Sequence, residues 1–139
     1  MKQLSYLFIG VLLFSGAAQA NGFFGKRFDT TIAAGGVYGG TAQRSTTCYV
    51  FNAGPDAIQI KSFEIIEQNV PGDTKDFDFC PPGTVLQPGE TCTITATGLP
   101  NQAHSCLARY RGSWRSQVRG TMDVRASGGT EVLVNAELR

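Results

Sequence analysis

Hydrophobic and polar residues alternate along most of this chain in short segments, which are separated by clusters of Gly, Pro, Asn and Asp. An alternation with a period of two places successive side chains on opposite faces of a β-strand. Residues 46–52 show it most clearly, since Cys48, Val50 and Asn52 would share one face. Helical periodicity is almost absent, so the pattern predicts an all-β sandwich or barrel.

The pattern predicts seven or eight short strands joined by turns. The predicted ranges are 28–34, 46–52, 57–66, 91–97, 104–111, 114–126 and 131–138. The alternation slips around Ser62-Phe63, which indicates a β-bulge. Gly112-Ser113 predicts a two-residue type II′ hairpin turn, and residues 127–130 predict a second hairpin. Residues 69–78 are polar and are predicted to form a loop.

The first twenty residues indicate the compartment of the protein. Lys2 is followed by the apolar residues 4–14 and by the small-residue cleavage site Ala18-Gln19-Ala20. This is the pattern of a secretory signal peptide, and its apolar run is shorter than a membrane span. Cleavage near Ala20 would release residues 21–139 as a secreted or periplasmic protein.

The rest of the chain divides into a short segment and one domain. Residues 21–40 are glycine-rich and are expected to be partly flexible around one strand, whereas residues 41–139 suit a single sandwich domain. No second apolar stretch follows the leader, so we predict no membrane span in the mature chain. Removal of Lys2 lowers the formal net charge from +1 to zero, and no overall charge indicates nucleic acid as a partner.

The charges are unevenly spread along the chain. Acidic residues concentrate between positions 56 and 90, and arginines concentrate between positions 109 and 139. Exposed charges on a secreted domain are normally solvated, so two solvated faces are the simplest interpretation. Head-to-tail contact between copies, or contact with a polar partner, is the alternative interpretation.

Two turn motifs carry a resemblance to a known family. Residues 49–54 read Tyr-Val-Phe-Asn-Ala-Gly, Cys80 follows, and residues 86–94 read Leu-Gln-Pro-Gly-Glu-Thr-Cys-Thr-Ile. With these motifs, the stretch 48–111 resembles the immunoglobulin-like sandwich repeats of the abnormal-spindle and hydin type. The resemblance implies an immunoglobulin-like antiparallel β-sandwich of seven or eight strands. Such domains bind, space or decorate and share no active site, so the resemblance supports the fold more than any function.

Four cysteines follow the leader, would mature in an oxidising compartment, and allow three disulfide pairings. In the implied sandwich, Cys48 and Cys106 would lie on the inner faces of strands equivalent to B and F, and Cys80 and Cys92 would flank one Pro/Gly-rich turn. We therefore favour Cys48–Cys106 with Cys80–Cys92, and the other two pairings stay open. The spacing contains no close Cys-x-x-Cys pair, which argues against a zinc site.

Few other residues indicate chemistry. His104 is the only histidine, and we expect it at a strand edge or in a loop without a special role. Asp73, Asp76 and Asp78 lie in one loop and offer the hard oxygen ligands of calcium, but Lys75 opposes a cation there. A solvated acidic loop is the simpler interpretation. Because no metal cluster, cofactor motif or nucleophile–base pair is present, we predict a protein without a cofactor that is not an enzyme.

The predicted turn at Gly112-Ser113 carries the most suggestive surface residues. With a two-residue turn, Arg111 and Trp114 would face each other across the hairpin and could stack as a cation–π pair. Tyr, Trp and Arg dominate binding hot spots. Tyr110, Arg111, Trp114 and Arg115 are therefore the candidate partner-binding residues. The structural alternative is a Trp in the core, or a stacked pair that only shields the end of the hairpin.

Together these features predict a secreted or periplasmic domain that binds or associates without catalysis. Its predicted partner is another protein or a component of the cell envelope. Self-association in a pilin-like or fibre-like subunit is one alternative, because residues 28–40 could add as a strand to an open sheet edge of a neighbouring copy. A small secreted hydrolase inhibitor, with a disulfide-bonded hairpin as its wedge, is another.

Overall fold

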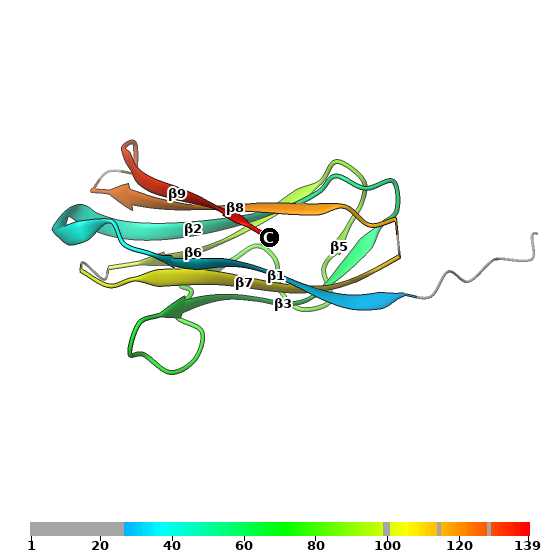
Figure 1. Cartoon of the computed structure of the whole chain (residues 1–139), viewed down its shortest axis with the longest axis horizontal. Helices are drawn as coiled ribbons and strands as arrows, with labels where there is room; N and C mark the ends of the chain where they lie inside the picture. Colours follow the sequence, from blue (N-terminus) through cyan, green and yellow to red (C-terminus); the bar gives the residue numbers. More distant parts are fainter. Residues whose placement is uncertain (1–26, 99–100, 114, 128) are drawn as a thin grey trace, which may run out of the picture.

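The computed structural model describes residues 27–98, 101–113, 115–127 and 129–139, which form two β-sheets packed face to face (Figure 1). One sheet has four strands in the order β1-β7-β3-β5, and the other has five in the order β4-β6-β2-β8-β9. All neighbouring strands are antiparallel. The strands are β1 Phe28–Val37, β2 Gln43–Asn52, β3 Ile58–Glu67, β4 Phe77–Asp78, β5 Val85–Leu86, β6 Thr91–Thr97, β7 His104–Gly112, β8 Val118–Ala126 and β9 Val132–Leu138, with a 3-10 helix at Gly40–Ala42 between β1 and β2.

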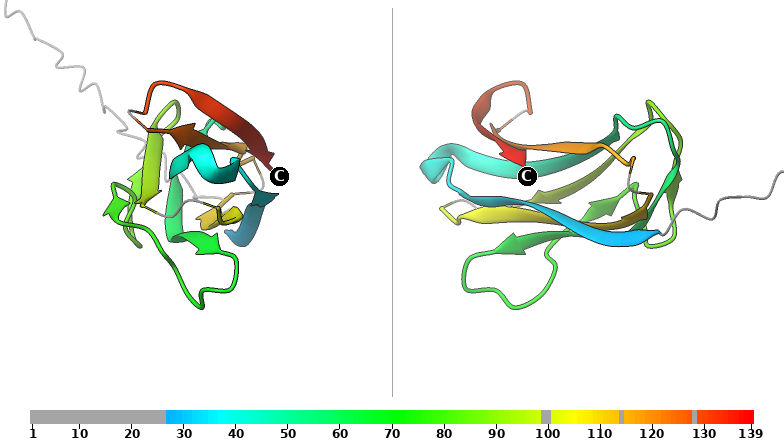
Figure 2. Two further views of the ribbon diagram at one scale, coloured as in Figure 1. Left: turned by 90° about the vertical axis from the view of Figure 1, so that its left-hand side faces the viewer. Right: turned by 45° about the vertical axis from the view of Figure 1, so that its right-hand side comes forward.

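This arrangement confirms the predicted immunoglobulin-like β-sandwich. The two layers are visible from the end and obliquely in Figure 2. Along β2, Cys48, Val50 and Asn52 are buried between the sheets, whereas Tyr49 and Phe51 lie on the outer face. The alternation of β3 and β7 buries their inner residues in the same way. The period-two pattern of the sequence therefore builds the core.

Both disulfides of the favoured pairing are present. Cys48 of β2 and Cys106 of β7 join the two sheets, with Cα atoms 6.1 Å apart. Cys80 and Cys92, with Cα atoms 5.5 Å apart, tie the segment after β4 to β6. The pairs are separated by 58 and 12 positions, for which chain entropy suggests about 4 and about 3 kcal/mol of stabilisation. Two disulfides fit an oxidising environment.

Several strands differ in extent from the sequence-based expectations, and one predicted bulge is confirmed. The described residues form nine strands rather than seven or eight, because two-residue strands, β4 and β5, arise in segments predicted as loop and turn. The register of β3 on β7 shifts between Ile60 and Ser62, which confirms the bulge. β1 is an edge strand of the four-stranded sheet, paired with β7 from Phe28 to Val37. The glycine-rich segment 21–40 thus supplies a strand of the sandwich, while residues 21–26 lie outside the described residues.

The hairpin predicted at Gly112-Ser113 is absent. β7 ends at Gly112 in one sheet and β8 begins at Val118 in the other, and the connection between them is called the crossing loop. Packed sheets lie roughly 10 Å apart, which is too far for a two-residue turn between paired strands. Gly112 fits this crossing because a Cβ there would lie 2.8 Å from the Cβ of Ser116. The hairpin predicted at residues 127–130 does join two paired strands, β8 and β9.

Candidate binding cleft at an open sheet edge

A cleft of about 520 Å³ opens along one side of the sandwich, at the end where β8 begins. Its lining consists of Tyr110, Ser116, Gln117, Val118, Arg119, Gly120, Thr121, Glu137, Leu138 and Arg139. In Figure 1 the start of β8, which supplies much of this lining, is the orange strand to the right of the C-terminus. The cleft therefore lies along the start of β8, beside the end of β9, with Tyr110 contributed by the other sheet.

β9 covers only part of the edge of β8. The two strands pair from Arg125↔Val132 to Gly120↔Leu138, whereas β8 begins two residues earlier, at Val118. On the other edge, the N–H of Ala53 donates to the carbonyl of Gln117 at 2.8 Å. Because hydrogen bonding alternates between the two edges of a strand, Val118 directs its N–H and C=O away from β2. Both groups therefore face the cleft.

The facing edge of β1 is open in the same place. The N–H of Ala33 donates to the carbonyl of Arg139 at 3.0 Å, and the N–H of Arg139 donates back at 3.1 Å. By the same alternation, the N–H and C=O of Thr31 point to this edge. In the described ranges, the only strand that pairs with β1 is β7, on its other side. Thr31 thus presents its backbone groups on the edge of β1 next to the Ala33–Arg139 contact, whereas Val118 belongs to the cleft lining itself.

The inner face of β1 is also uncovered at this end. Its register on β7 places Phe28 beside Gly112 and Thr30 beside Tyr110, on the face that turns toward the other sheet. Phe28 is nevertheless 50% exposed, whereas Ile32 on the same face is 8% exposed. The five-stranded sheet therefore covers β1 only from the neighbourhood of Ile32 onward, and Phe28 borders the open part.

Tyr110 and Leu138 form the floor of the cleft. Their side chains are almost fully buried. Burial raises the pKa of the Tyr110 phenol, and its hydrogen bond to Thr30 offsets this only in part, so the ring stays neutral at physiological pH. A Cβ on Gly120 would lie 2.7 Å from the Tyr49 carbonyl oxygen and 3.0 Å from Leu138 Cδ2. The end of β9 therefore packs directly on β8 and closes one end of the cleft.

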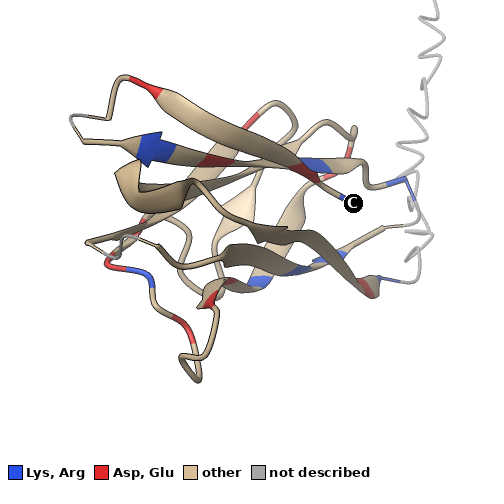
Figure 3. Cartoon of the chain, turned by 60° about the vertical axis from the view of Figure 1, so that its left-hand side comes forward, with Lys and Arg blue, Asp and Glu red and all other residues tan. Residues whose placement is uncertain are grey.

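Arg119, Glu137 and Arg139 supply the charge of the cleft. Nη2 of Arg139 lies 3.3 Å from Oε2 of Glu137. Since Gly120 pairs with Leu138, one further step of the register brings Arg119 opposite Arg139. Like charges in facing positions repel each other, and the Glu137 carboxylate pairs with Arg139 and not with Arg119 among the described residues. Figure 3 shows basic and acidic segments close together beside the C-terminus.

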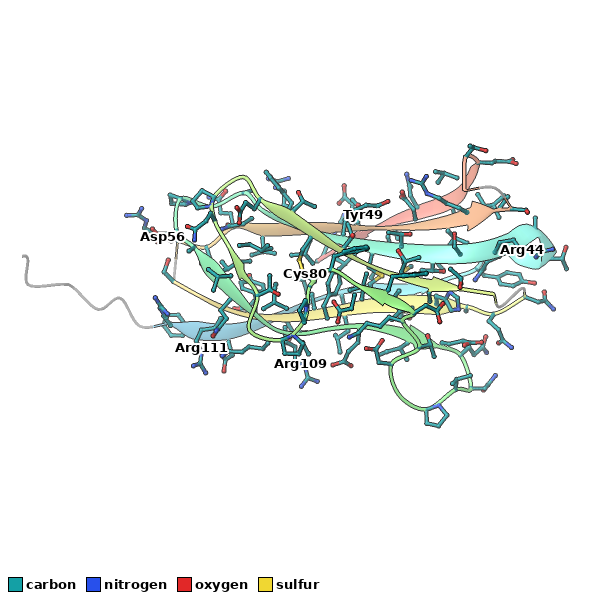
Figure 4. The ribbon with its side chains drawn as sticks, turned by 180° about the vertical axis from the view of Figure 1, so that it is seen from behind. Arg44, Tyr49, Asp56, Cys80, Arg109 and Arg111 are labelled. Carbon is teal, nitrogen blue, oxygen red and sulfur yellow. A yellow bond between two sulfur atoms is a disulfide. The ribbon has the colours of Figure 1, made fainter. Side chains whose placement is uncertain are left out.

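The structure separates the candidate residues that the sequence grouped in a hairpin. Tyr110 lies on the inner face of β7, whereas Arg111 lies on the outer face, on the same side as Arg109 (Figure 4). Arg111 binds Asp29 of β1 through hydrogen bonds of 2.8 and 3.1 Å, and this contact lowers the pKa of Asp29. Trp114 lies outside the described residues, and the hairpin on which its predicted stack with Arg111 depended does not form.

Arg115 forms an ion pair that links the crossing loop to the turn after β2. Its Nη2 lies 3.3 Å from Oδ1 of Asp56, and the hydroxyl of Ser113 donates to Oδ2 of Asp56 at 2.6 Å. The same loop lines the cleft through Ser116 and Gln117. Of the three predicted partner-binding residues that the structure describes, Tyr110 belongs to the cleft lining, and Arg111 and Arg115 make structural ion pairs.

In the acidic loop that could offer calcium ligands, Lys75 pairs with two of the three aspartates. Its ammonium lies 2.6 Å from Asp73 and 3.1 Å from Asp78. Burial lowers the pKa of Lys75, but its hydrogen bonds to both carboxylates outweigh burial and raise that pKa. Asp76 points elsewhere and accepts the hydroxyl of Thr97 at 2.7 Å. Within the described ranges, no group of three or more His, Cys, Asp or Glu side chains is arranged to hold a metal ion.

His104 is buried in the core rather than at a strand edge or in a loop. It begins β7, is 2% exposed and contacts the hydroxyl of Thr46 through Nδ1. The amide Nε2 of Gln43 lies 3.2 Å from the same nitrogen. Glu67, also buried, is its direct partner in the β3–β7 ladder. Burial lowers the pKa of His104, which favours the neutral ring.

Comparison of the chain with protein-family models, with curated proteins and with solved structures finds no match. The resemblance of residues 48–111 to the abnormal-spindle and hydin repeats therefore stays a prediction. Where the structure describes the chain, no helix has the length and the apolar character needed to cross a membrane.

No sequence motif distinguishes the cleft residues from other strand residues. Val118 and Leu138 read as ordinary strand residues in alternating segments. Whether a strand lies at an edge depends on the order of strands in the sheet, which no local motif of this chain states. The two-residue difference between the ends of β8 and β9 becomes visible only in the register.

Proposed function

We propose that this protein is a secreted or periplasmic, non-enzymatic domain that binds an extended segment of a partner protein in the cleft. The partner is another protein, either free or part of the cell envelope. The observation that carries the proposal is the open backbone edge of β8 at Val118 in the cleft lining, together with the open edge of β1 at Thr31 beside the Ala33–Arg139 contact, to which the described strands supply no partner. An extended peptide that adds to a sheet edge gains affinity from such backbone groups and specificity from side-chain pockets.

The directions of β1 and β8 relative to β9 are compatible with one strand inserted between them. Ala33 and Arg139 exchange two hydrogen bonds, which is the pattern of an antiparallel ladder. β9 is also antiparallel to β8. A bound segment that continues in the direction of β9 would therefore run antiparallel to both β1 and β8. Its alternate side chains would point to the floor at Tyr110 and Leu138.

Two features of the chain support the proposed compartment. The leader of residues 1–20 and the two disulfides both support a secreted or periplasmic location. We propose cleavage near Ala20. In that compartment, an open sheet edge is either protected by a partner or exposed to unwanted pairing, so a dedicated partner strand gives the open edge a use.

The two alternatives of the sequence analysis receive less support. Residues 28–37 are already paired with β7 as β1, so their donation to a second copy would require that pairing to open first. The hairpin wedge proposed for a hydrolase inhibitor is replaced by the crossing loop between β7 and β8. The inhibitor therefore stays a prediction without a specific observation in its favour.

A proline substitution tests the cleft directly. Val118→Pro removes the N–H that faces the cleft, and proline is tolerated where a strand N–H is not used in the ladder. Asn135→Pro is the matched control, because Asn135 is exposed on β9 and the same alternation directs its N–H away from β8. Circular dichroism and thermal melting should first show that both variants keep the fold of residues 21–139.

The readout is a cross-linked pull-down from the envelope and medium of the native host. One partner captured by the wild type and by Asn135→Pro, but lost with Val118→Pro, would support strand binding in the cleft. Equal capture by all three proteins would place the interaction elsewhere and contradict the proposal. Recovery of only multimers of the bait, unchanged by Val118→Pro, would favour self-assembly through another surface.

A further inference from the structure

We infer that the segment bound in the cleft carries an acidic side chain next to an apolar one, and that Arg119 recognises the acid. This inference rests on the proposed function and specifies its partner: an extended acidic polypeptide rather than any exposed strand. The inference is argued from the charge of Arg119 and from the register of β9 on β8.

Arg119 differs from the other arginines around the cleft in its surroundings. Arg115 and Arg139 each lie within 4 Å of a carboxylate, and so does Arg111 on β7. For Arg119 no such ion pair occurs among the residues that the structure describes, and its side chain is exposed. It also faces Arg139 in the extended register. A carboxylate brought to this position would give the Arg119 guanidinium a partner of opposite charge.

The register of β9 on β8 predicts the position of that carboxylate. A strand continuing the line of β9 along β8 would place one residue opposite Val118 and the next opposite Gln117. The residue opposite Val118 would point inward, toward Tyr110 and Leu138, where an apolar side chain fits. Its neighbour would point outward, on the face of Arg119. Diagonal neighbours across an antiparallel pair are within reach of long side chains, so an Asp or Glu there meets the guanidinium.

The same charge argues against the chain's own amino-terminal segment as the occupant. Residues 21–27 read Asn-Gly-Phe-Phe-Gly-Lys-Arg and contain no acid. Insertion of this segment from a second copy would bring two more cations beside Arg119 and Arg139. Like charges placed against each other disfavour a wrong partner. The occupant is therefore a segment of another protein.

The test begins with residues 21–139, with both disulfides formed, and a display library of random linear peptides as the probe. Peptides that are enriched on the wild type but not on Val118→Pro are then synthesised in three forms: as selected, with each acid replaced by its amide, and with each acid replaced by Lys. The synthetic peptide 21–27 is measured beside them. Fluorescence anisotropy gives the dissociation constants at about 0.05 M and about 0.5 M salt.

Arg119→Gln is the decisive variant, and Arg109→Gln is its matched control. Arg109 is an exposed arginine on the outer face of the other sheet (Figure 4), away from the cleft lining. We expect acid-containing peptides to be enriched, and the amide form to bind about fivefold more weakly to the wild type and to Arg109→Gln. Arg119→Gln should abolish this difference, and high salt should reduce it.

The other outcomes separate the two proposals. Peptides that depend on Val118 but bind equally as acid and amide would overturn the acidic specificity and leave strand binding in place. Tighter binding of peptide 21–27 than of any acidic peptide would also overturn this inference, in favour of a second copy. If no enriched peptide depends on Val118, both the acidic specificity and the proposed function fail.

Discussion

Ala33 and Arg139 exchange both of their backbone hydrogen bonds, so the end of β9 in one sheet is tied to the edge strand of the other. This contact closes the side of the sandwich at Ala33. The cleft opens beside this contact, with Arg139 and Val118 in its lining, and Thr31 lies two residues before Ala33 on β1. Closed and open parts of the same edge therefore lie next to each other.

Amide hydrogen exchange should distinguish these two parts. Ala33 donates a backbone hydrogen bond, so its N–H should be protected, whereas the N–H groups of Thr31 and Val118 should exchange faster because they point away from their paired strands β7 and β2. Exchange measured residue by residue by NMR on residues 21–139 would show the contrast. Protection of Val118 equal to that of Ala33 would mean that its N–H has a partner, and the basis of the cleft proposal would be lost.

Gly54 should not tolerate a side chain. A Cβ there would lie 2.6 Å from the backbone nitrogen of Gln117 and 3.1 Å from the carbonyl oxygen of Arg115. Gly54→Ala should therefore push the crossing loop away and destabilise the protein by about 1–3 kcal/mol. Gly35→Ala is the control, because nothing lies within 4 Å of a Cβ at Gly35, and it should change stability by less than about 1 kcal/mol. Urea unfolding measures both, and equal losses would contradict the packing described here.

Asn52 should be a key polar residue of the core. Its buried amide donates to the carbonyls of Asp56 and Leu86 at 2.9 and 3.0 Å, and its Oδ1 accepts the N–H of Gly54 at 3.1 Å. Asn52→Ala leaves these groups without their partner, so we expect a loss of about 2 kcal/mol or more. Asn135→Ala, on an exposed part of β9, should stay within about 0.5 kcal/mol of the wild type. A loss at Asn52 no larger than at Asn135 would refute this role.

The two disulfides should contribute unequally to stability. The Cys48–Cys106 bridge closes the longer loop and joins the two sheets, while Cys80–Cys92 pins a local segment. We expect the double variant Cys48→Ala/Cys106→Ala to lose about 4 kcal/mol and Cys80→Ala/Cys92→Ala about 3 kcal/mol. Denaturant unfolding of both variants, compared with the wild type, checks the order. The reverse order would show that loop length is not the deciding factor.

Stability should decrease below neutral pH because of His104. The Oε1 atom of Gln43 accepts the N–H of Gly39 at 2.9 Å, which turns its Nε2 toward Nδ1 of His104. Nδ1 is therefore an acceptor in the folded protein, and burial lowers the pKa of the ring. The unfolded chain binds a proton more readily. The stabilisation is complete above the ordinary pKa near 6.5 and is lost as the pH falls toward the lower folded pKa.

Unfolding free energies at about pH 7.5 and about pH 5.5 test this sign, since a histidine is the only side chain whose ordinary pKa falls in that window. The chain has one histidine, so the assignment is direct. We expect the wild type to be less stable at the lower pH and His104→Gln to lose most of this dependence. A wild type that is more stable at the lower pH would contradict the neutral buried ring.

The local pattern of the sequence determined the strands and the inner faces. The predicted strand 91–97 matches β6, Thr91–Thr97, and the inward positions of β2 are buried as predicted. The reason is that period-two alternation is read within one strand and needs no knowledge of its neighbours. The disulfide pairing also followed, once an immunoglobulin-like sandwich was assumed, because bridges between inner faces have few geometric solutions.

The tertiary structure alone decided which strands are neighbours and which edges stay open. Tyr110 reads as a surface residue beside a turn, but it lies on the floor of the cleft because β7 and β8 part into different sheets. Val118 faces the cleft only because β9 pairs with β8 no further than Gly120. Strand order and relative strand length arise from contacts between residues far apart in the chain. A pattern confined to a few neighbouring residues determines a strand and its inner face, and the open edge is a property of the assembled sheets.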